Sequence, residues 1–244
     1  MSAQSDRMET ATPGRNLGEM LAERIENEII AEGWNVGKVI GSEAELCVRY
    51  GVSRAVFREA IRIVGHHGVA EMRRGPGGGL VVVEPRVDAA VRTVLLNLEY
   101  LDISPTQINE ARSALEIACV RSATSNLTKQ GEARIREFLD QEVELIIEGR
   151  DPGQPSEDYP SNQFHLLLAE LTGNPAMLLF VQILSRVTSR HSDPAQSRAD
   201  VERAAVEVHK AHSRIAEAIL SRDPDAAERR LKRHLSAIVN YMHD

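Results

Sequence analysis

The sequence predicts a mainly α-helical protein of two domains, an N-terminal winged helix-turn-helix with a small β wing and a C-terminal all-α antiparallel helical bundle. Two helical stretches joined by a tight turn occupy residues 42–66, and two short apolar runs flank RRGPGGG at residues 73–79. Beyond Pro85 the hydrophobic period is helical almost to the end. We therefore expect a flexible tail over residues 1–14 and domains over residues 15–85 and 86–244.

The helix-turn-helix is predicted from helix-start signals and apolar spacing. Apolar residues recur every four positions over residues 17–31, which predicts an amphipathic helix. Ser42, with Glu45 three residues later, is typical of a capping box and begins a short helix that ends at Gly51. The next helix runs from Ser53 to about residue 66, and its apolar face leaves Arg54, Arg58 and Arg62 on another face.

The charge distribution indicates what this first domain could bind. The whole chain carries a net charge of −7, which argues against a nucleic-acid partner for the molecule as a whole. Residues 33–86, however, hold eight Lys or Arg and five Glu, whereas residues 87–244 hold 18 basic and 24 acidic residues. The basic charge is thus concentrated in the helix-turn-helix, as expected for a DNA-binding module attached to an acidic sensor.

The second helix of the motif has side chains suited to reading bases. Arg54 and Arg58 lie one turn apart, and the arginine fork pairs with O6 and N7 of guanine in the major groove. Ser53 at the helix start and the amide end of the Ser42 helix are suited to phosphates. The alternative is a solvated arginine face, which the adjacent caps, turn and hairpin make the weaker interpretation.

The predicted wing adds a second basic surface. Arg73 and Arg74 precede glycines that permit close backbone approach, which suits contact with the DNA backbone or the minor groove. Cys47 and Cys119 are isolated, so neither a disulfide framework nor a cysteine metal site is expected. No signal peptide and no apolar run of membrane-spanning length is present, so we expect a cytoplasmic protein without a membrane partner.

The second domain contains seven predicted helices, several of which begin with a capping residue followed by proline, at Ser104, Asn174 and Asp223. They are expected near residues 88–100, 104–125, 130–149, 158–172, 175–191, 198–220 and 224–242. Residues 151–160 form the one obvious loop.

Three histidines occupy positions where an apolar side chain is expected. His212 and His234 lie on the apolar stripes of the last two helices, and His165 lies in a run that is apolar nearly all round. His209 lies off the stripe. Three inward imidazoles on three helices could hold a divalent metal of the zinc type. The alternative is that each is a core histidine satisfied by a hydrogen bond.

The motifs GSEAEL, GVSRAVFREAI and RRGPGGG resemble the DNA-binding domain of GntR-type bacterial transcription regulators over residues 15–85. The resemblance implies that DNA is contacted by the motif's serine, arginine and glycine residues, namely Ser53, Arg54, Arg58, Arg74 and Gly75. Gly41 stands where that family usually has proline, and Ala44 where it often has arginine, which removes one expected contact.

Four further motifs, RSALE (112–116), FHLLLAELTGNP (164–175), HSRIAEAI (212–219) and the terminal RHL, resemble the effector domain of the FadR subgroup. The resemblance implies a divalent metal (Zn, Ni or Mn type) bound by the three histidines and an aspartate, at whose position Ser161 stands here. It also implies that Arg112 lines the effector cavity and holds a ligand carboxylate. Arg112 and Glu116 are alternatively a simple ion pair one turn apart.

The function that these features predict is a ligand-responsive regulator, a repressor in our interpretation, that binds a pseudo-palindromic operator as a homodimer. Its small-molecule effector would bind in the bundle. Two alternatives stay open: the same class of regulator binding an acyl-CoA-like ligand without metal, and a metal-dependent hydrolase. The hydrolase is disfavoured because no carboxylate at motif spacing presents itself as a general base.

Overall fold

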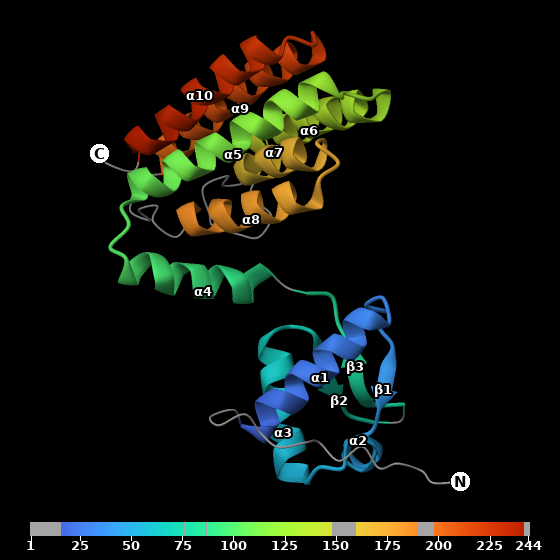
Figure 1. The fold of residues 1–244 in the computed structure, drawn as a ribbon. Helices are drawn as coiled ribbons and strands as arrows, with labels where there is room; N and C mark the ends of the chain where they lie inside the picture. The colour runs from blue at the N-terminus through green and yellow to red at the C-terminus, as the bar shows by residue number, and fades with distance from the viewer. Residues whose placement is uncertain (1–15, 76, 86, 148–159, 190–197, 242–244) are drawn as a thin grey trace. The chain divides into compact units, whose positions relative to one another are not determined.

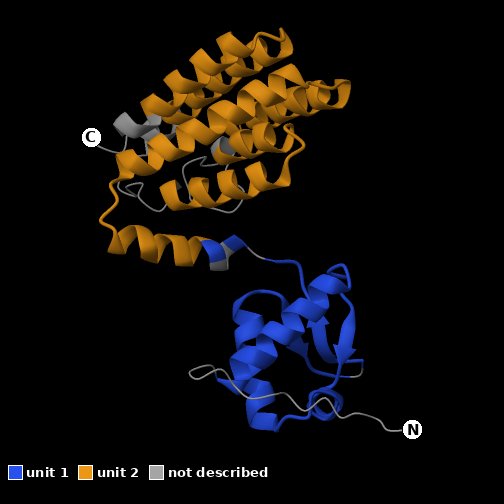
Figure 2. Cartoon of the chain, in the orientation of Figure 1, with its two compact units in different colours: residues 1–90 blue, residues 91–244 orange. Residues whose placement is uncertain are grey.

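The structure is a computed structural model of the 244-residue chain, and it describes residues 16–75, 77–85, 87–147, 160–189 and 198–241. The chain divides into two compact units, residues 1–90 and 91–244 (Figure 2). Over the described ranges it forms ten helices and one three-stranded sheet (Figure 1), so the predicted mainly α fold class is confirmed. No helix in these ranges combines the length and apolar character that crossing a membrane requires.

The first unit contains three helices and three short strands in the order α1, β1, α2, α3, β2, β3. Their bounds are α1 Leu17–Ala31, β1 Val39–Gly41, α2 Glu43–Tyr50, α3 Arg54–His66, β2 Ala70–Arg73 and β3 Gly79–Val82. The predicted capping box is present, since the Ser42 hydroxyl oxygen accepts from the Glu45 amide and the Glu45 carboxylate accepts from the Ser42 amide. Gly51 then ends α2 in the left-handed conformation, with φ +65°.

The sheet has one strand more than the sequence predicts. β3 lies between β1 and β2 and is antiparallel to both, and Arg73 pairs with Gly79 where the wing turns. Because β1 has only three residues, it shows no alternation by which a strand could be recognised. A Cβ atom at Gly79 would lie 2.5 Å from the carbonyl oxygen of Gly41, so the approach of β1 to β3 requires glycine there.

The core of the first unit forms where α1 and α3 pack together over the sheet. Ile25 of α1, Phe57 and Val64 of α3 and Leu80 of β3 are almost completely buried. These residues follow the predicted apolar stripes, so burial of one face of α3 directs the opposite face, which carries its arginines, toward solvent.

The second unit is a bundle in which α5 is the central helix, in contact with α7, α8, α9 and α10 (Figure 1). The bounds of its helices are α4 Val87–Tyr100, α5 Pro105–Ser125, α6 Lys129–Ile147, α7 Pro160–Glu170, α8 Pro175–Ser189, α9 Arg198–Leu220 and α10 Pro224–Tyr241. Ser104 caps α5 in a capping box with Gln107, as its sequence indicates. Val120, Phe164, Ile215 and Leu231 bring α5, α7, α9 and α10 into one buried core.

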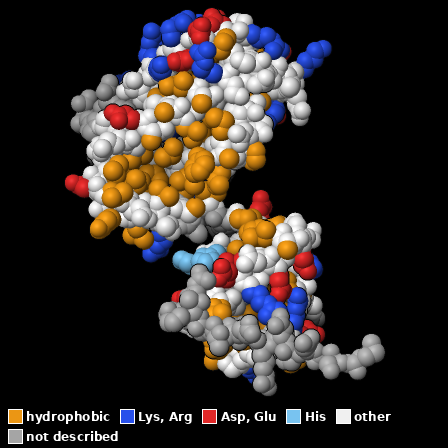
Figure 3. Space-filling model, in the orientation of Figure 1, with side chains coloured by type: hydrophobic (Ala, Val, Ile, Leu, Met, Phe, Trp, Pro, Cys, Tyr) orange, Lys and Arg blue, Asp and Glu red, His pale blue; other side chains and the backbone are white. Residues whose placement is uncertain are grey.

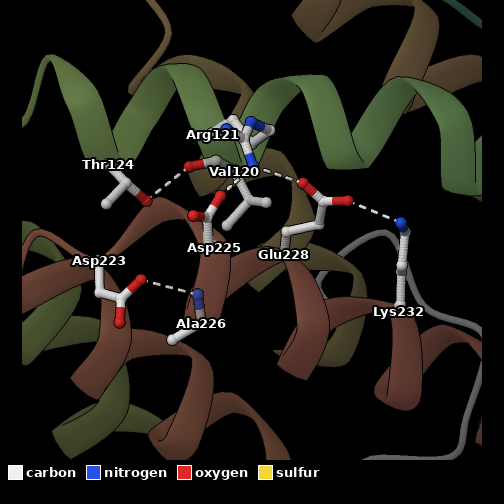
Figure 4. A network of polar contacts seen from close by, with 8 residues as sticks. All are labelled: Val120, Arg121, Thr124, Asp223, Asp225, Ala226, Glu228 and Lys232. Atoms are coloured by element: carbon white, nitrogen blue, oxygen red, sulfur yellow. Dashed lines mark hydrogen bonds and ion pairs between the residues drawn. The ribbon is translucent and has the colours of Figure 1, made fainter.

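Polar contacts on the outside of the bundle join α5 to α10 (Figure 4). Arg121 donates to Asp225 at 2.7 Å and to Glu228 at 2.6 Å, and Glu228 also accepts from Lys232 at 2.6 Å. Water screens these exposed pairs, so the buried apolar contacts between the two helices account for most of their association. The Asp223 carboxylate accepts from the Ala226 amide at 2.8 Å, which caps α10 as predicted.

Candidate metal and DNA-binding sites

The three histidines singled out from the sequence meet in the interior of the bundle. His165 comes from α7, His212 from α9 and His234 from α10, and their side chains are 1%, 0% and 5% exposed. Candidate ligand atoms of all three lie within 4.8 Å of one another. The Nε2 atoms of His165 and His234 are 3.3 Å apart. Burial of one face of each helix therefore carries these nitrogens to a common point.

The arrangement of ring nitrogens fits a divalent metal ion. Nε2 of His212 is buried and has no hydrogen-bond partner among the described residues. Ligands at about 2.0–2.1 Å from a tetrahedral ion lie about 3.3–3.4 Å apart, which matches the separation of the His165 and His234 nitrogens. Burial, together with the neighbouring His165 and His212, lowers the pKa of His234 to about 2. Burial also lowers the pKa of His212 against the opposing effect of Glu142. Neutral imidazoles are the form that binds metal.

Arg112 and Glu116 of α5 are both buried, at 3% and 2% exposure, so they are not a surface ion pair. Arg112 Nε donates to Glu116 Oε1 at 2.5 Å, and His165 Nδ1 donates to the other carboxylate oxygen. Burial by itself raises the pKa of Glu116, but the Arg112 guanidinium and the His165 imidazole outweigh it and hold this pKa at about 2. The two residues are thus linked to the histidine cluster through His165.

One nitrogen of the Arg112 guanidinium remains available for a ligand. Nη2 of Arg112 is buried, and no residue in the described ranges is hydrogen-bonded to it. A buried donor without a partner costs free energy, and a guanidinium is suited to bind a carboxylate. The interior of the bundle therefore combines unpartnered nitrogen atoms on Arg112 and His212 with a fixed negative charge on Glu116.

Two residues of the cluster, Glu142 and His209, were not predicted from the sequence. Glu142 of α6 is 4% exposed and accepts from His209 Nδ1 and His212 Nδ1, each at 2.8 Å. His209 lies off the apolar stripe of α9, so its position in the sequence does not indicate a place in the cluster. A signal was present, since Glu142 lies seven residues after the buried Ile135 and thus on the buried face of α6.

Ser161, at the position expected for an aspartate ligand, lies in the first turn of α7, four residues before His165. Its side chain lies outside the described part of the structure, and its contribution to a metal site stays a prediction.

The predicted base-reading residues lie on one exposed surface of the first unit. Ser53 caps α3 by accepting from the Val56 amide at 3.3 Å, and Arg54 follows it in the first turn. Arg58 is 70% exposed, and its Nε donates to Glu43 of α2 at 3.1 Å. A guanidinium in this state is accessible to DNA, and its contact with Glu43 uses only Nε.

The predicted wing contacts are also exposed. Arg73 donates through Nε to Glu71 at 2.8 Å, and Arg74 follows it at the end of β2. Gly75 has φ +102° and no neighbouring atoms where a Cβ would stand, so the turn leaves open space beside the backbone. The Ser42 hydroxyl, by contrast, is already engaged with Glu45 in the capping box.

A winged helix-turn-helix joined to a helical unit with a buried histidine, arginine and carboxylate cluster defines a class: DNA-binding regulators with a sensor domain. Residues 17–82 match the family described as "Bacterial regulatory proteins, gntR family", and residues 107–237 match the FCD domain. The chain therefore belongs to the GntR family of bacterial transcription regulators, in the FadR-type group that carries an FCD domain.

Individual relatives agree with this assignment. The Uxu operon regulator of Haemophilus influenzae is 27% identical over 66% of this chain and 55% of its own length. The HTH-type transcriptional repressor NanR of Citrobacter rodentium is 27% identical over 94% of this chain and 86% of its own length. A Streptococcus agalactiae GntR structure, 20% identical, covers 91% of this chain and 99% of that one with a TM-score of 0.67 and shares the fold. The chain is thus a transcription regulator and not an enzyme, and the family assignment disfavours the hydrolase alternative.

Proposed function

We propose that this regulator is a repressor whose operator affinity changes when a small carboxylate effector binds in the bundle beside a divalent metal of the Zn, Ni or Mn type. The observation that carries the proposal is the cluster of buried, unpartnered nitrogens on His212 and Arg112. Both are strong ligand-binding groups, and neither is satisfied by the protein itself. They suit a ligand that offers a metal-binding oxygen and a carboxylate.

Charge in the site supports an anionic effector. Arg112 and Glu116 neutralise each other, and burial lowers the pKa of His212 and of His234, which favours their neutral forms. A divalent ion would add two positive charges, of which the buried carboxylate of Glu142 offsets one. The remaining positive charge, enclosed in a low-dielectric interior, favours an anion that binds the metal and the free edge of Arg112.

The DNA-binding part of the proposal rests on the exposed arginines of α3 and the wing. Residues 15–85 would bind DNA, and residues 86–244 would bind effector and dimerise; the tail expected over residues 1–14 lies outside the described part of the structure. A homodimer would place one α3 in each half-site of a pseudo-palindromic operator. Metal and effector would alter the placement of the two recognition helices relative to the half-site spacing. Since its target is DNA, the protein would act in the cytoplasm.

The test is an operator titration with an effector panel. An operator would be selected from random duplexes, and its binding followed by fluorescence anisotropy with Zn²⁺ and a panel of small carboxylic acids. We expect at least one acid to weaken operator binding in the wild type. Arg112→Ala should lose this response and keep its operator affinity, whereas the exposed Arg121→Ala, on the same helix, should respond normally. An operator affinity that ignores every ligand the bundle binds would refute the proposal.

A further inference from the structure

Glu142 of α6 is a buried carboxylate that accepts hydrogen bonds from two histidines. Its side chain is 4% exposed, and its two oxygens accept from two different histidines of α9, each at 2.8 Å. A carboxylate accepts hydrogen bonds and donates none, so the Nδ1 atoms of both His209 and His212 carry protons. The carboxylate thereby selects one tautomer of each ring.

The selected tautomer of His212 has the form required of a metal ligand. A neutral imidazole has one ring proton, so a proton on Nδ1 leaves Nε2 with a free lone pair. Nε2 of His212 is the buried nitrogen that lacks a partner among the protein atoms. One face of the His212 ring stacks on Phe164, with centroids 4.3 Å apart. Glu142 and Phe164 together therefore fix both the proton and the orientation of this ring.

His209 helps to hold the Glu142 carboxylate in place through a hydrogen bond. Nδ1 of His209 donates to the second carboxylate oxygen of Glu142, and its Nε2 lies 3.3 Å from the Ser213 hydroxyl. The His209 side chain is 21% exposed. Since its nitrogens are both engaged away from the cluster, His209 acts as an anchor for Glu142 and not as a ligand.

We propose that Glu142 is a positioning residue for the metal site: by accepting the Nδ1 protons of His212 and His209, it keeps the Nε2 lone pair of His212 directed at the ion. Glu142 would not itself be a metal ligand, since its two oxygens are engaged by His209 and His212. This inference rests on the proposed metal-dependent function and adds a residue outside the predicted ligand set. The contact between Glu142 of α6 and His212 corresponds to the contact that Glu116 of α5 makes with His165.

The experiment compares Glu142→Leu with Glu144→Leu in the full-length protein. Both variants remove a carboxylate from α6 and replace it with an apolar side chain of similar size, but Glu144 is exposed. Co²⁺ is the probe, and its affinity is measured by competition with a chromophoric chelator. We expect Glu142→Leu to weaken Co²⁺ binding about 10–100-fold, the usual cost of losing such a contact, and Glu144→Leu to bind like the wild type.

A second measurement separates positioning from a purely structural role. In metal-free protein labelled with ¹⁵N-histidine, long-range ¹H–¹⁵N spectra report which ring nitrogen carries the proton, and a His212→Gln spectrum assigns the signal. We expect wild-type His212 to be protonated on Nδ1 and Glu142→Leu to lose this preference. Wild-type His212 protonated on Nε2 would overturn the inference whether or not the variant folds.

The outcomes also distinguish this inference from the proposed function. A wild-type protein that binds no Co²⁺ would remove the proposed metal site and, with it, the role of Glu142. A wild-type protein that binds Co²⁺, with Glu142→Leu binding within about twofold of it, would remove only the role of Glu142.

Discussion

Replacing Glu116 by glutamine should destabilise the bundle by about 3 kcal/mol at neutral pH. The Glu116 pKa falls from 4.5 to about 2 on folding, and each tenfold change in this equilibrium corresponds to about 1.4 kcal/mol, so the ionised carboxylate contributes about 3 kcal/mol. Loss of one partner from a buried ion pair costs about 3–5 kcal/mol by a separate argument, since Arg112 would keep its charge at 3% exposure.

The assay is urea unfolding of metal-free protein between pH 7 and pH 3, followed by far-ultraviolet circular dichroism and by tryptophan fluorescence. The chain has one tryptophan, Trp34, in the first unit, so fluorescence reports that unit separately from the helices of the bundle. Because the folded-state pKa of Glu116 is depressed, its contribution is present above about pH 4.5 and is lost as the pH falls toward 2. The difference between wild type and Glu116→Gln should therefore shrink in acid.

Glu110→Gln is the matched control, because Glu110 lies on the exposed face of the same helix. It should change the free energy of unfolding by less than about 0.5 kcal/mol. A Glu116→Gln variant within 1 kcal/mol of the wild type at pH 7, or a difference that stays constant down to pH 3, would refute the assigned contribution of the buried carboxylate.

Three further outcomes follow from the contacts described. Arg58→Ala should weaken operator binding by about 1–3 kcal/mol at fixed salt, as measured by fluorescence anisotropy. Arg134→Ala in the bundle should leave operator binding unchanged, and equal losses in the two variants would contradict a base contact. Gly79→Ala should lower the urea midpoint of the Trp34 transition, because its Cβ would lie 2.5 Å from the Gly41 carbonyl oxygen; an unchanged midpoint would contradict this. Zn²⁺ at a hundred times its dissociation constant should raise the free energy of unfolding of the bundle by about 2.7 kcal/mol, and a chelator should reverse the gain. An unchanged free energy of unfolding would count against a metal site.

The histidine cluster shows what sequence periodicity can predict. His212 and His234 lie on stripes spaced by three and four residues, and helix geometry directs such stripes to one face. The apolar run around residue 165 indicated His165, helix-start signals and the turn indicated the helix-turn-helix, and the family resemblance implied the role of Arg112. The capping box at Ser42 and the helix cap at Ser104 were readable because all of their bonds form within four residues. These features depend on local geometry, which the chain specifies by itself.

Other features depend on what a distant segment brings across an interface. Glu142 contacts His212 across a sequence separation of 70, and no spacing within α6 or α9 indicates that pairing. The burial of Arg112 beside Glu116 is set by the helices packed around α5 and not by the sequence of α5 itself. β1 was missed for the same reason, since its three residues form a strand only beside β3.

The contact between Arg58 and Glu43 has a consequence for selectivity among DNA sequences. Without DNA, the Glu43 carboxylate occupies the Nε of Arg58 at 3.1 Å, and it competes with any acceptor that a duplex offers. Phosphates occur at every position along the duplex, whereas paired guanine acceptors occur only in suitable sequences. We therefore expect Glu43 to act as an internal competitor that weakens Arg58 contacts to arbitrary DNA more than contacts to an operator.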